Sequence, residues 1–293
     1  MKRIPPPRRN GRDDFDRAVS RRNTANKKIL KEVRNDVLAA YGQYSSLLAD
    51  ISGATPLPVR EAESSALIGN YSLLDRGRPL EDLRSAVLAA SEPNGYACPL
   101  CGRTQVSAID HFLPKSEFPE FSIFAENLVA VCDRCNRRKG DHCDRDSGLL
   151  FFHVYFEDLP EREILFAEIE VSSSVSVSYA LRAPSHIDQV PYERLRRQFE
   201  ILELADFYQK EAVSEISDHS EVWHCAFEEG GADRVRLMAD ILAMSAQKRG
   251  VNNWKSALYR GLSRSEEFCQ RGFSLIGRVV LGQGAGESSI VEV

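Results

Sequence analysis

The alternation of apolar and polar positions divides the first third of the chain into helices. From Phe15 to about Asp50, apolar residues recur at three- and four-residue spacing, which is typical of amphipathic helix. The stretch SGATPLPVR interrupts this pattern, and two further helices are expected at 61–75 and 79–91. Residues 1–14 are rich in Pro and Arg, and we expect them to be disordered or loosely attached.

The last part of the chain shows a β-hairpin followed by helices. EILFAEIEV and VSVSYALR alternate apolar and polar residues around a Ser-rich turn, which predicts a hairpin near 164–181. Helical spacing of apolar residues predicts a long helix at 188–216 and two more at 231–249 and 252–262. The pattern therefore favours the α+β class, mostly α.

Residues 96–145 differ in character and contain two CxxC pairs, in YACPLCGR and VAVCDRCNRR. The pairs can place four thiolates tetrahedrally around Zn²⁺, from Cys98, Cys101, Cys132 and Cys135. The odd total of seven cysteines argues against a disulfide framework and for a metal site in a reducing compartment. Cys225 and Cys269 lie in apolar helical contexts, and we expect both to be buried. A site closed by four sulfur ligands has no open position, so the predicted zinc is structural.

The insert between the two pairs carries residues that suit phosphodiester hydrolysis. Asp110 and His111 stand side by side, Asn127 precedes an apolar run, and Asn136 and Lys139 share one helical face after the second pair. A hairpin and a helix held by one zinc would bring Asp110, His111 and Asn136 together. Carboxylate and amide oxygens are hard ligands for Mg²⁺ or Mn²⁺, and an imidazole can accept a proton from water. Asp110 and His111 could instead cap a loop, but between two zinc knuckles we favour catalysis.

This order of residues resembles the HNH, or ββα-metal, endonucleases in their zinc-stapled branch. CxxC, DHxxPKS and NLVxVCxxCNxxK follow one another over residues 98–139, as in that family. The resemblance implies a zinc-bound ββα-metal module embedded in a helical scaffold, with His111 as general base and Asp110 as a ligand of the catalytic metal. It further implies that Asn127 holds the loop and the histidine in place. Asn136 takes the third position, where many members have His, which favours Mg²⁺ or Mn²⁺ over a catalytic zinc.

Basic residues around the motif are the predicted contacts to nucleic acid. The resemblance implies that Lys139 meets a phosphate. Arg137 and Arg138 form a basic edge beside it, and Lys115 follows the Asp–His pair. Each could be a solvated surface charge, or part of a turn in the case of Lys115, but backbone phosphates require a track of this kind.

Charge is distributed unevenly along the chain. Residues 1–34 carry twelve Lys and Arg against four Asp and Glu, whereas residues 146–293 have a net charge of -9. The basic arm suits a polyanion, although a solvated tail has the same composition, and the acidic part suits contact with a protein. FHVYFEDL, YERLRRQFEILELADFY and NNWKSALYRGL resemble HNH proteins encoded beside an ATPase in bacterial anti-phage systems, such as the Septu nuclease subunit. This resemblance implies an ATPase partner.

Together these patterns predict three regions and one activity. The regions are a basic arm with helices (1–95), a zinc-bound HNH nuclease module (96–145), and a hairpin with helices for partner docking (146–293). The predicted activity is metal-dependent hydrolysis of nucleic acid, with DNA as the expected substrate. The alternatives are a non-catalytic zinc-ribbon module that binds nucleic acid or protein, and a nuclease that is inert without its partner. Without a bilayer-spanning apolar run or a secretory signal, we expect a cytoplasmic protein with no membrane contact.

Overall fold

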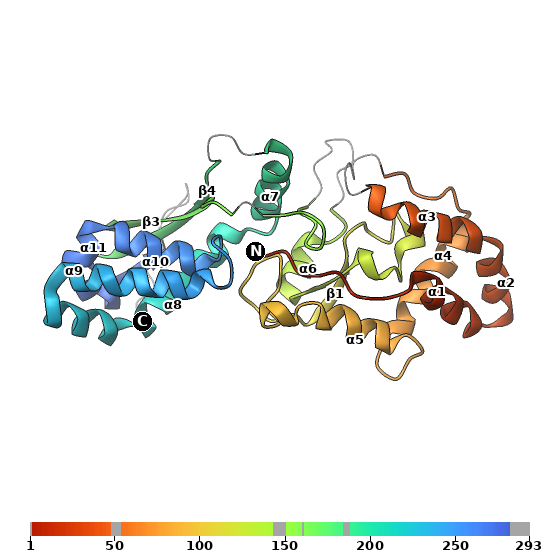
Figure 1. Cartoon of the computed structure of the whole chain (residues 1–293), viewed down its shortest axis with the longest axis horizontal. Coiled ribbons are helices and arrows are strands. Elements are labelled where there is room, and N and C mark those ends of the chain that lie inside the picture. The colour runs from red at the N-terminus through yellow and green to blue at the C-terminus, as the bar shows by residue number, and fades with distance from the viewer. Residues whose placement is uncertain (1, 48–53, 143–150, 160, 184–187, 282–293) are drawn as a thin grey trace. The chain divides into compact units, whose positions relative to one another are not determined.

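The structure is a computed structural model that describes residues 2–47, 54–142, 151–159, 161–183 and 188–281. Its contacts divide into two compact units. The N-terminal unit comprises residues 3–158 with 193–198, and the C-terminal unit comprises residues 159–192 with 199–293. Helices predominate, and the described strands form one two-stranded and one three-stranded sheet (Figure 1). This composition confirms the predicted class, α+β and mostly α. Within the described ranges, every helix falls short of the length and apolar content that a bilayer crossing requires.

The N-terminal unit contains six α-helices and two strands among its described residues. The helices are α1 (Gly11–Ser20), α2 (Thr24–Glu32), α3 (Arg34–Leu47), α4 (Glu61–Gly69), α5 (Glu81–Ala89) and α6 (Asp133–Lys139). The strands are β1 (Ala108–His111) and β2 (Leu128–Val131), and short 3-10 helices include η2 (Asn70–Leu74), η3 (Glu92–Asn94), η4 (Pro119–Phe121) and η5 (Ala125–Asn127).

At the start of the chain, one expectation is confirmed and one is wrong. The stretch expected to be helical forms three successive helices, and Asn23 begins α2 by accepting a hydrogen bond from the backbone N of Asn26 (2.9 Å). The segment before α1 is not loosely attached. Ile4 is 1% exposed, and its backbone N donates to the Val154 carbonyl (2.9 Å). Burial of this one apolar side chain among Pro and Arg fixes a segment that its composition alone marked as disordered.

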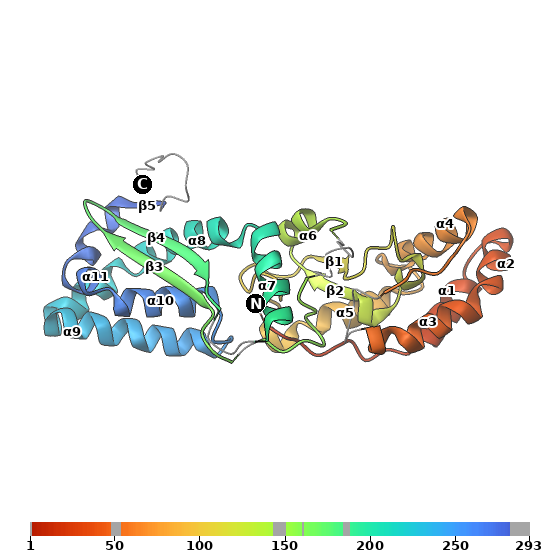
Figure 2. The same cartoon turned by 90° about the horizontal axis from the view of Figure 1, so that it is seen from above.

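Strands β1 and β2 pair antiparallel and lead directly into α6 (Figure 2). Asp110 lies opposite Val129 and His111 opposite Leu128, at the end of β1 where the chain leaves the sheet. The insert between the strands is anchored by stacking of Tyr41, from α3, on Phe124, with ring centroids 4.2 Å apart. The helical scaffold thus packs on the loop that follows the Asp–His pair.

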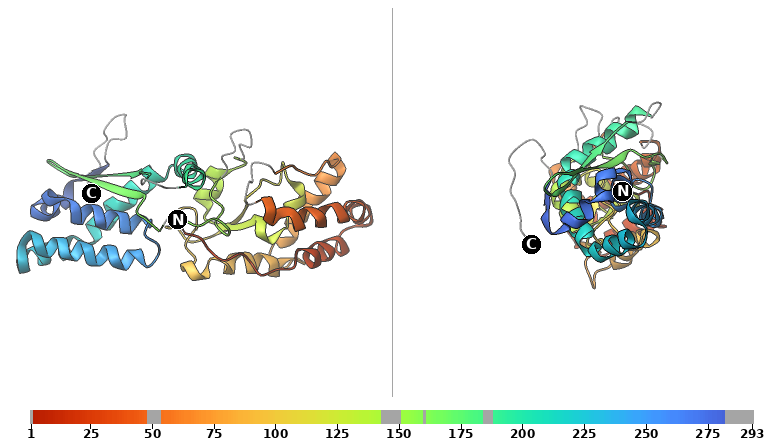
Figure 3. Two further views of the ribbon diagram at one scale, coloured as in Figure 1. Left: turned by 45° about the horizontal axis from the view of Figure 1, so that its top comes forward. Right: turned by 90° about the vertical axis from the view of Figure 1, so that its left-hand side faces the viewer.

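The C-terminal unit is a three-stranded sheet with helices. Its strands are β3 (Leu165–Val171), β4 (Val175–Leu181) and β5 (Val279–Leu281), and its helices are α8 (Leu204–Asp218), α9 (Ser220–Gln247), α10 (Trp254–Arg264) and α11 (Glu266–Gln270), followed by η6 (Gly272–Arg278). Helix α7 (Gln189–Ile201) is shared, because residues 193–198 belong to the N-terminal unit. The predicted hairpin is confirmed, with β5 added parallel to β4. Helices α8, α10 and α11 contact this sheet, and α9 packs on α10 and α11 (Figure 3).

The long helix predicted at 188–216 is two helices, α7 and α8. The break lies at Leu202, which is fully buried, and at Glu203, which adopts a left-handed conformation (φ 47°, ψ 52°). Because neither residue is Gly or Pro, the sequence contains no breaker at this point. Helix α9 is kinked at Gly230 and Gly231, where the backbone leaves helical geometry.

Candidate functional site

Four cysteines form a zinc-binding group at one end of the β1–β2–α6 segment. The Sγ atoms of Cys98, Cys101, Cys132 and Cys135 all lie within 4.8 Å of one another, and all four residues are buried. Each knuckle is closed by its backbone, since Gly102 N donates to Cys98 O (2.6 Å) and Asn136 N donates to Cys132 O (2.9 Å). Burial raises the pKa of Cys98, so a buried set of thiolates needs a cation to be stable. Outside this group, Cys269 is buried as expected, whereas Cys225 is exposed on α9, contrary to expectation.

A cavity of about 230 Å³ opens where β1 ends and α6 ends. Six of the side chains that line it are polar or charged: Tyr71, Asp110, His111, Lys115, Asn136 and Asp141. Asp110, His111 and Asn136 all line this cavity, so they lie together as the sequence predicts. Because β1 supplies the first two residues and α6 supplies Asn136, the arrangement depends on the zinc-bound hairpin and helix.

His111 lies at the cavity in a defined protonation state. Its side chain is almost fully buried, and its Nε2 lies 3.0 Å from the carbonyl oxygen of Ser122. A carbonyl only accepts, so Nε2 carries the proton and Nδ1 keeps its lone pair. Burial lowers the pKa of His111 to about 4, which keeps the imidazole neutral at physiological pH.

Two groups hold the carboxylate of Asp110, one at each oxygen. Oδ1 accepts a hydrogen bond from the backbone N of His111 (2.7 Å), and Oδ2 lies 3.0 Å from Nζ of Lys139. Lys139 also donates to the His111 carbonyl (2.7 Å) and is 3% exposed. Burial raises the pKa of Asp110, and Lys139 opposes this effect. The Lys139 ammonium is therefore paired with the Asp110 carboxylate in this structure. This pairing does not agree with the predicted contact between Lys139 and a phosphate.

The cavity residues have the chemistry of a site for a hard divalent cation. The Asn136 side chain makes no hydrogen bond within the described residues, and the Asp141 carboxylate is close enough to raise the pKa of Asp110. One or two protein oxygens, completed by water and phosphate oxygens, is a common ligand set for Mg²⁺. Asp110, Asn136 and Asp141 therefore fit Mg²⁺ or Mn²⁺.

Asn127 lies outside the cavity and fixes the loop that follows His111. It is fully buried; its Oδ1 accepts hydrogen bonds from Leu113 N (2.8 Å) and from the Tyr44 hydroxyl (3.0 Å), and its Nδ2 donates to Leu113 O (3.0 Å). The Tyr44 hydroxyl also contacts Nε2 of His153 (3.3 Å), so this hydroxyl joins the segments of Asn127 and His153 to α3. His153 is a packed core histidine, since it is 1% exposed and burial lowers its pKa to about 3.

The comparison with known families agrees with this geometry. Residues 98–142 match the sequence model of the HNH endonucleases. These residues form an HNH endonuclease domain. The HNH domain contains the zinc-binding group, both strands, α6 and every cavity side chain except that of Tyr71.

Two curated proteins show similarity to this chain. Protein ea31 of Escherichia phage lambda is 28% identical over 211 residues, which cover 67% of this chain and 70% of ea31. The Septu protein PtuB of Bacillus thuringiensis is 32% identical over 53 residues, which cover 18% of this chain and 21% of PtuB. No solved structure matches the chain significantly.

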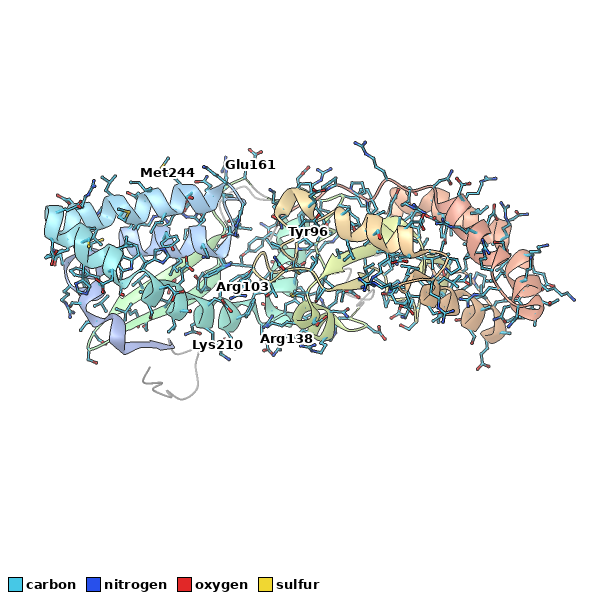
Figure 4. All side chains as sticks on the ribbon, turned by 90° about the horizontal axis from the view of Figure 1, so that it is seen from below. Tyr96, Arg103, Arg138, Glu161, Lys210 and Met244 are labelled. Carbon is cyan, nitrogen blue, oxygen red and sulfur yellow. The ribbon has the colours of Figure 1, made fainter. Side chains whose placement is uncertain are left out.

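The remaining predicted residues lie around the HNH domain's surface. Arg137 and Arg138 are exposed on α6, and Arg138 is seen at the surface in Figure 4. Lys115 is half-buried at the cavity, with its Nζ 4.2 Å from the centroid of the Tyr71 ring.

Sequence reasoning missed Tyr71 and Asp141. Asp141 follows Gly140, which ends α6 with a positive φ of 48°, and a carboxylate directly after this turn was the available signal. Tyr71 left no signal, because it comes from η2 in the helical region, 38 residues before Ile109, the residue whose carbonyl it contacts.

Proposed function

We propose that the protein is a metal-dependent endonuclease that hydrolyses phosphodiester bonds, with DNA as its substrate, in the cytoplasm. The observation that carries this proposal is the shared cavity. A neutral imidazole fixed through Nε2, a carboxylate and an amide side chain line the same 230 Å³ space. A non-catalytic zinc ribbon would have no need for this combination beside its cysteines.

Each residue has a defined task in the proposed reaction. Nδ1 of His111 accepts the proton of the attacking water, while Ser122 holds the opposite ring nitrogen. Asp110, Asn136 and Asp141 would hold the cation, which, when bound, offsets charge on the phosphate and on the leaving 3′ oxygen. Asn127 keeps the loop after His111 in place. The products would carry 5′-phosphate and 3′-hydroxyl ends.

The N-terminal unit carries basic groups that suit a polyanionic substrate. Many arginines of the basic arm are engaged in ion pairs; Arg9 and Arg17, for example, both contact Asp82. By contrast Lys27, Lys28 and Lys31 line an open hollow on α2, and none of the three has an ion-pair partner among the described residues. Together with Arg137 and Arg138 they would contact backbone phosphates away from the cavity.

A second proposal concerns a partner protein. The likeness to the Septu protein PtuB supports a role in anti-phage defence beside an ATPase. Helix α9 exposes Leu237, Ile241 and Met244 at helical spacing, and an apolar stripe of this kind on an acidic region suits contact with protein. Co-purification of the wild type with the product of a neighbouring ATPase gene tests this proposal.

The activity itself is tested by incubating the purified protein with plasmid DNA, with and without Mg²⁺ or Mn²⁺. We expect nicked or linear products only with the cation. His111→Ala should abolish cleavage because it removes the imidazole that accepts the proton of the attacking water, yet zinc content and thermal stability should remain near those of the wild type. A matched control is His224→Ala, an exposed histidine of the C-terminal unit, which should cleave normally.

Three results would count against the proposal. Cleavage that survives His111→Ala would remove this residue from the role of base. DNA binding without cleavage, under all cations and with the partner present, would favour the zinc-ribbon alternative. Cleavage of RNA in place of DNA would keep the chemistry and change the substrate.

A further inference from the structure

Tyr71 lies on the cavity of the HNH domain but belongs to another part of the chain. It stands in η2 (Asn70–Leu74), between α4 and α5, outside the residues that match the HNH family. Its hydroxyl donates a hydrogen bond to the carbonyl of Ile109 (2.8 Å), so η2 is attached to β1 one residue before Asp110. Burial raises the pKa of Tyr71, and the phenol stays protonated as a donor.

The ring of Tyr71 touches two functional groups of the cavity. Its centroid lies 4.7 Å from that of the His111 imidazole, at an interplanar angle of 54°. The ammonium of Lys115 lies 4.2 Å from the same centroid, within the range of a cation–π contact. One aromatic ring therefore contacts both the proposed base and a cation at the cavity.

These contacts restrict the two groups in different ways. The Nε2 bond to Ser122 fixes one edge of the imidazole, and the Tyr71 ring restricts rotation of the imidazole by contact. Lys115 has a long, flexible side chain, and within the described residues the Tyr71 ring is its contact at the cavity. Loss of the ring would thus release both groups at once.

We propose that Tyr71 is a positioning residue of the HNH site, whose ring holds the His111 imidazole and the Lys115 ammonium at a fixed separation around the scissile phosphate. The proposal rests on the nuclease activity proposed above. It makes the helical N-terminal region part of the active site, because the HNH domain alone lacks this ring. In this arrangement Lys115 binds an oxygen of the phosphate that the water attacks.

The test compares Tyr71→Phe with Tyr71→Leu in the full-length protein on plasmid DNA with Mn²⁺. Tyr71→Phe keeps the ring and loses the hydrogen bond to Ile109, so kcat should stay within about threefold of the wild type. Tyr71→Leu loses the ring, and kcat should fall by about 10- to 100-fold, the size of effect that a misplaced catalytic group produces. Lys115→Met should mainly raise KM, and its effect should be smaller in the Tyr71→Leu background than in the wild type.

A matched control separates positioning from simple loosening of η2. Leu73→Ala removes a buried side chain of the same 3-10 helix that does not line the cavity. Its kcat should remain near the wild-type value even if its melting temperature falls as far as that of Tyr71→Leu. An equal loss of kcat in the two variants would overturn the proposal.

A spectroscopic measurement tests the contact without any cleavage. In protein labelled with ¹⁵N-histidine, the His111 signal is identified by its absence in His111→Ala. We expect the Nε2–H tautomer and the same ring-proton shifts in the wild type and in Tyr71→Phe, and altered shifts in Tyr71→Leu. Unchanged shifts in Tyr71→Leu, or cleavage within twofold of the wild type, would overturn the proposal. Absence of cleavage by the wild type would instead refute the proposed function and leave the shift comparison valid.

Discussion

Lys139 has a different contact in the structure from the one that its place in the motif predicts. The spacing of Asn136 and Lys139 correctly places both on one helical face, but the sequence could not show that this face turns toward β1. There the ammonium meets Asp110 and the His111 carbonyl, at 3.0 Å and 2.7 Å. The residue types of the motif could be predicted because their chemistry is local; the burial of Lys139 and the approach of Tyr71 could not, since both depend on tertiary packing.

In Lys139→Met, a divalent cation should be able to replace the positive charge that Asp110 has lost. Removing one partner of a buried ion pair costs about 3–5 kcal/mol, and Asp110 would be left without a counter-charge. We therefore expect a marked loss of stability toward urea without added cation, and a partial recovery with Mg²⁺ or Mn²⁺, which neutralises the same carboxylate. Arg137→Met, on the exposed side of α6, is the control and should change stability by less than about 0.5 kcal/mol. A loss that the cation does not reduce would contradict this view of Asp110.

His153 predicts a pH dependence of stability. Burial lowers its pKa from 6.5 to about 3, so the folded protein binds the proton less well than the unfolded chain does. The stability that it contributes is therefore complete above about pH 6.5 and is lost as the pH falls toward 3. Between pH 7 and pH 5 this amounts to about 2 kcal/mol, because the unfolded chain gains the proton in this range. In urea titrations between pH 7 and pH 5, His153→Gln should lose less unfolding free energy than the wild type. An equal loss in the two proteins would show that His153 is not buried as a neutral group.

At the scale of elements, long and regular patterns were predictable and their interruptions were not. The hairpin β3–β4 follows from strict alternation, and η2 with α4 fills the helix predicted at 61–75. The break at Glu203 has no local cause in the sequence, since helical spacing continues on both sides of it. The close approach of α10 to β3 at Gly261 is likewise a feature of tertiary packing.

Gly261→Ala should separate α10 from the sheet. A Cβ at this position would lie 2.5 Å from the carbonyl oxygen of Ala167 in β3, so the backbone would have to move. We expect a loss of about 1–3 kcal/mol, as in other overpacked sites, despite the better helix propensity of Ala. Gly42→Ala in α3 is the matched control, because its Cβ would meet nothing within 4 Å and should stabilise by about 0.5–1 kcal/mol. Thermal melts that show the same sign for both changes would contradict the packing.

At the scale of the whole molecule, the HNH domain is a part of the N-terminal unit and does not stand apart from it. The predicted three-region division put the helices before residue 96 in a separate region. They nevertheless pack on the HNH domain, through Tyr41 and Tyr44 on the insert between the strands and through Tyr71 on β1. These contacts join residues far apart in the chain, which a reading of local patterns does not detect. Zinc is thus expected to stabilise one unit selectively.

Removal of zinc tests this selectivity. Chelation, or Cys98→Ser, should raise amide hydrogen exchange in β1, β2 and α6, because the zinc-binding group holds both ends of this segment. Exchange in β3 and β4 of the C-terminal unit should not change. A uniform rise in amide hydrogen exchange across both units would mean that the zinc-binding group does not stabilise the HNH domain selectively.

We propose that Asp110 and Asn136 hold a second, harder cation beside His111. Titration of zinc-loaded protein with Mn²⁺, followed by electron paramagnetic resonance, tests it most directly. We predict that the wild type and His111→Ala bind Mn²⁺ with similar affinity, whereas Asp110→Ala and Asn136→Ala lose at least about tenfold. Unchanged Mn²⁺ affinity in Asp110→Ala and Asn136→Ala would contradict the claim.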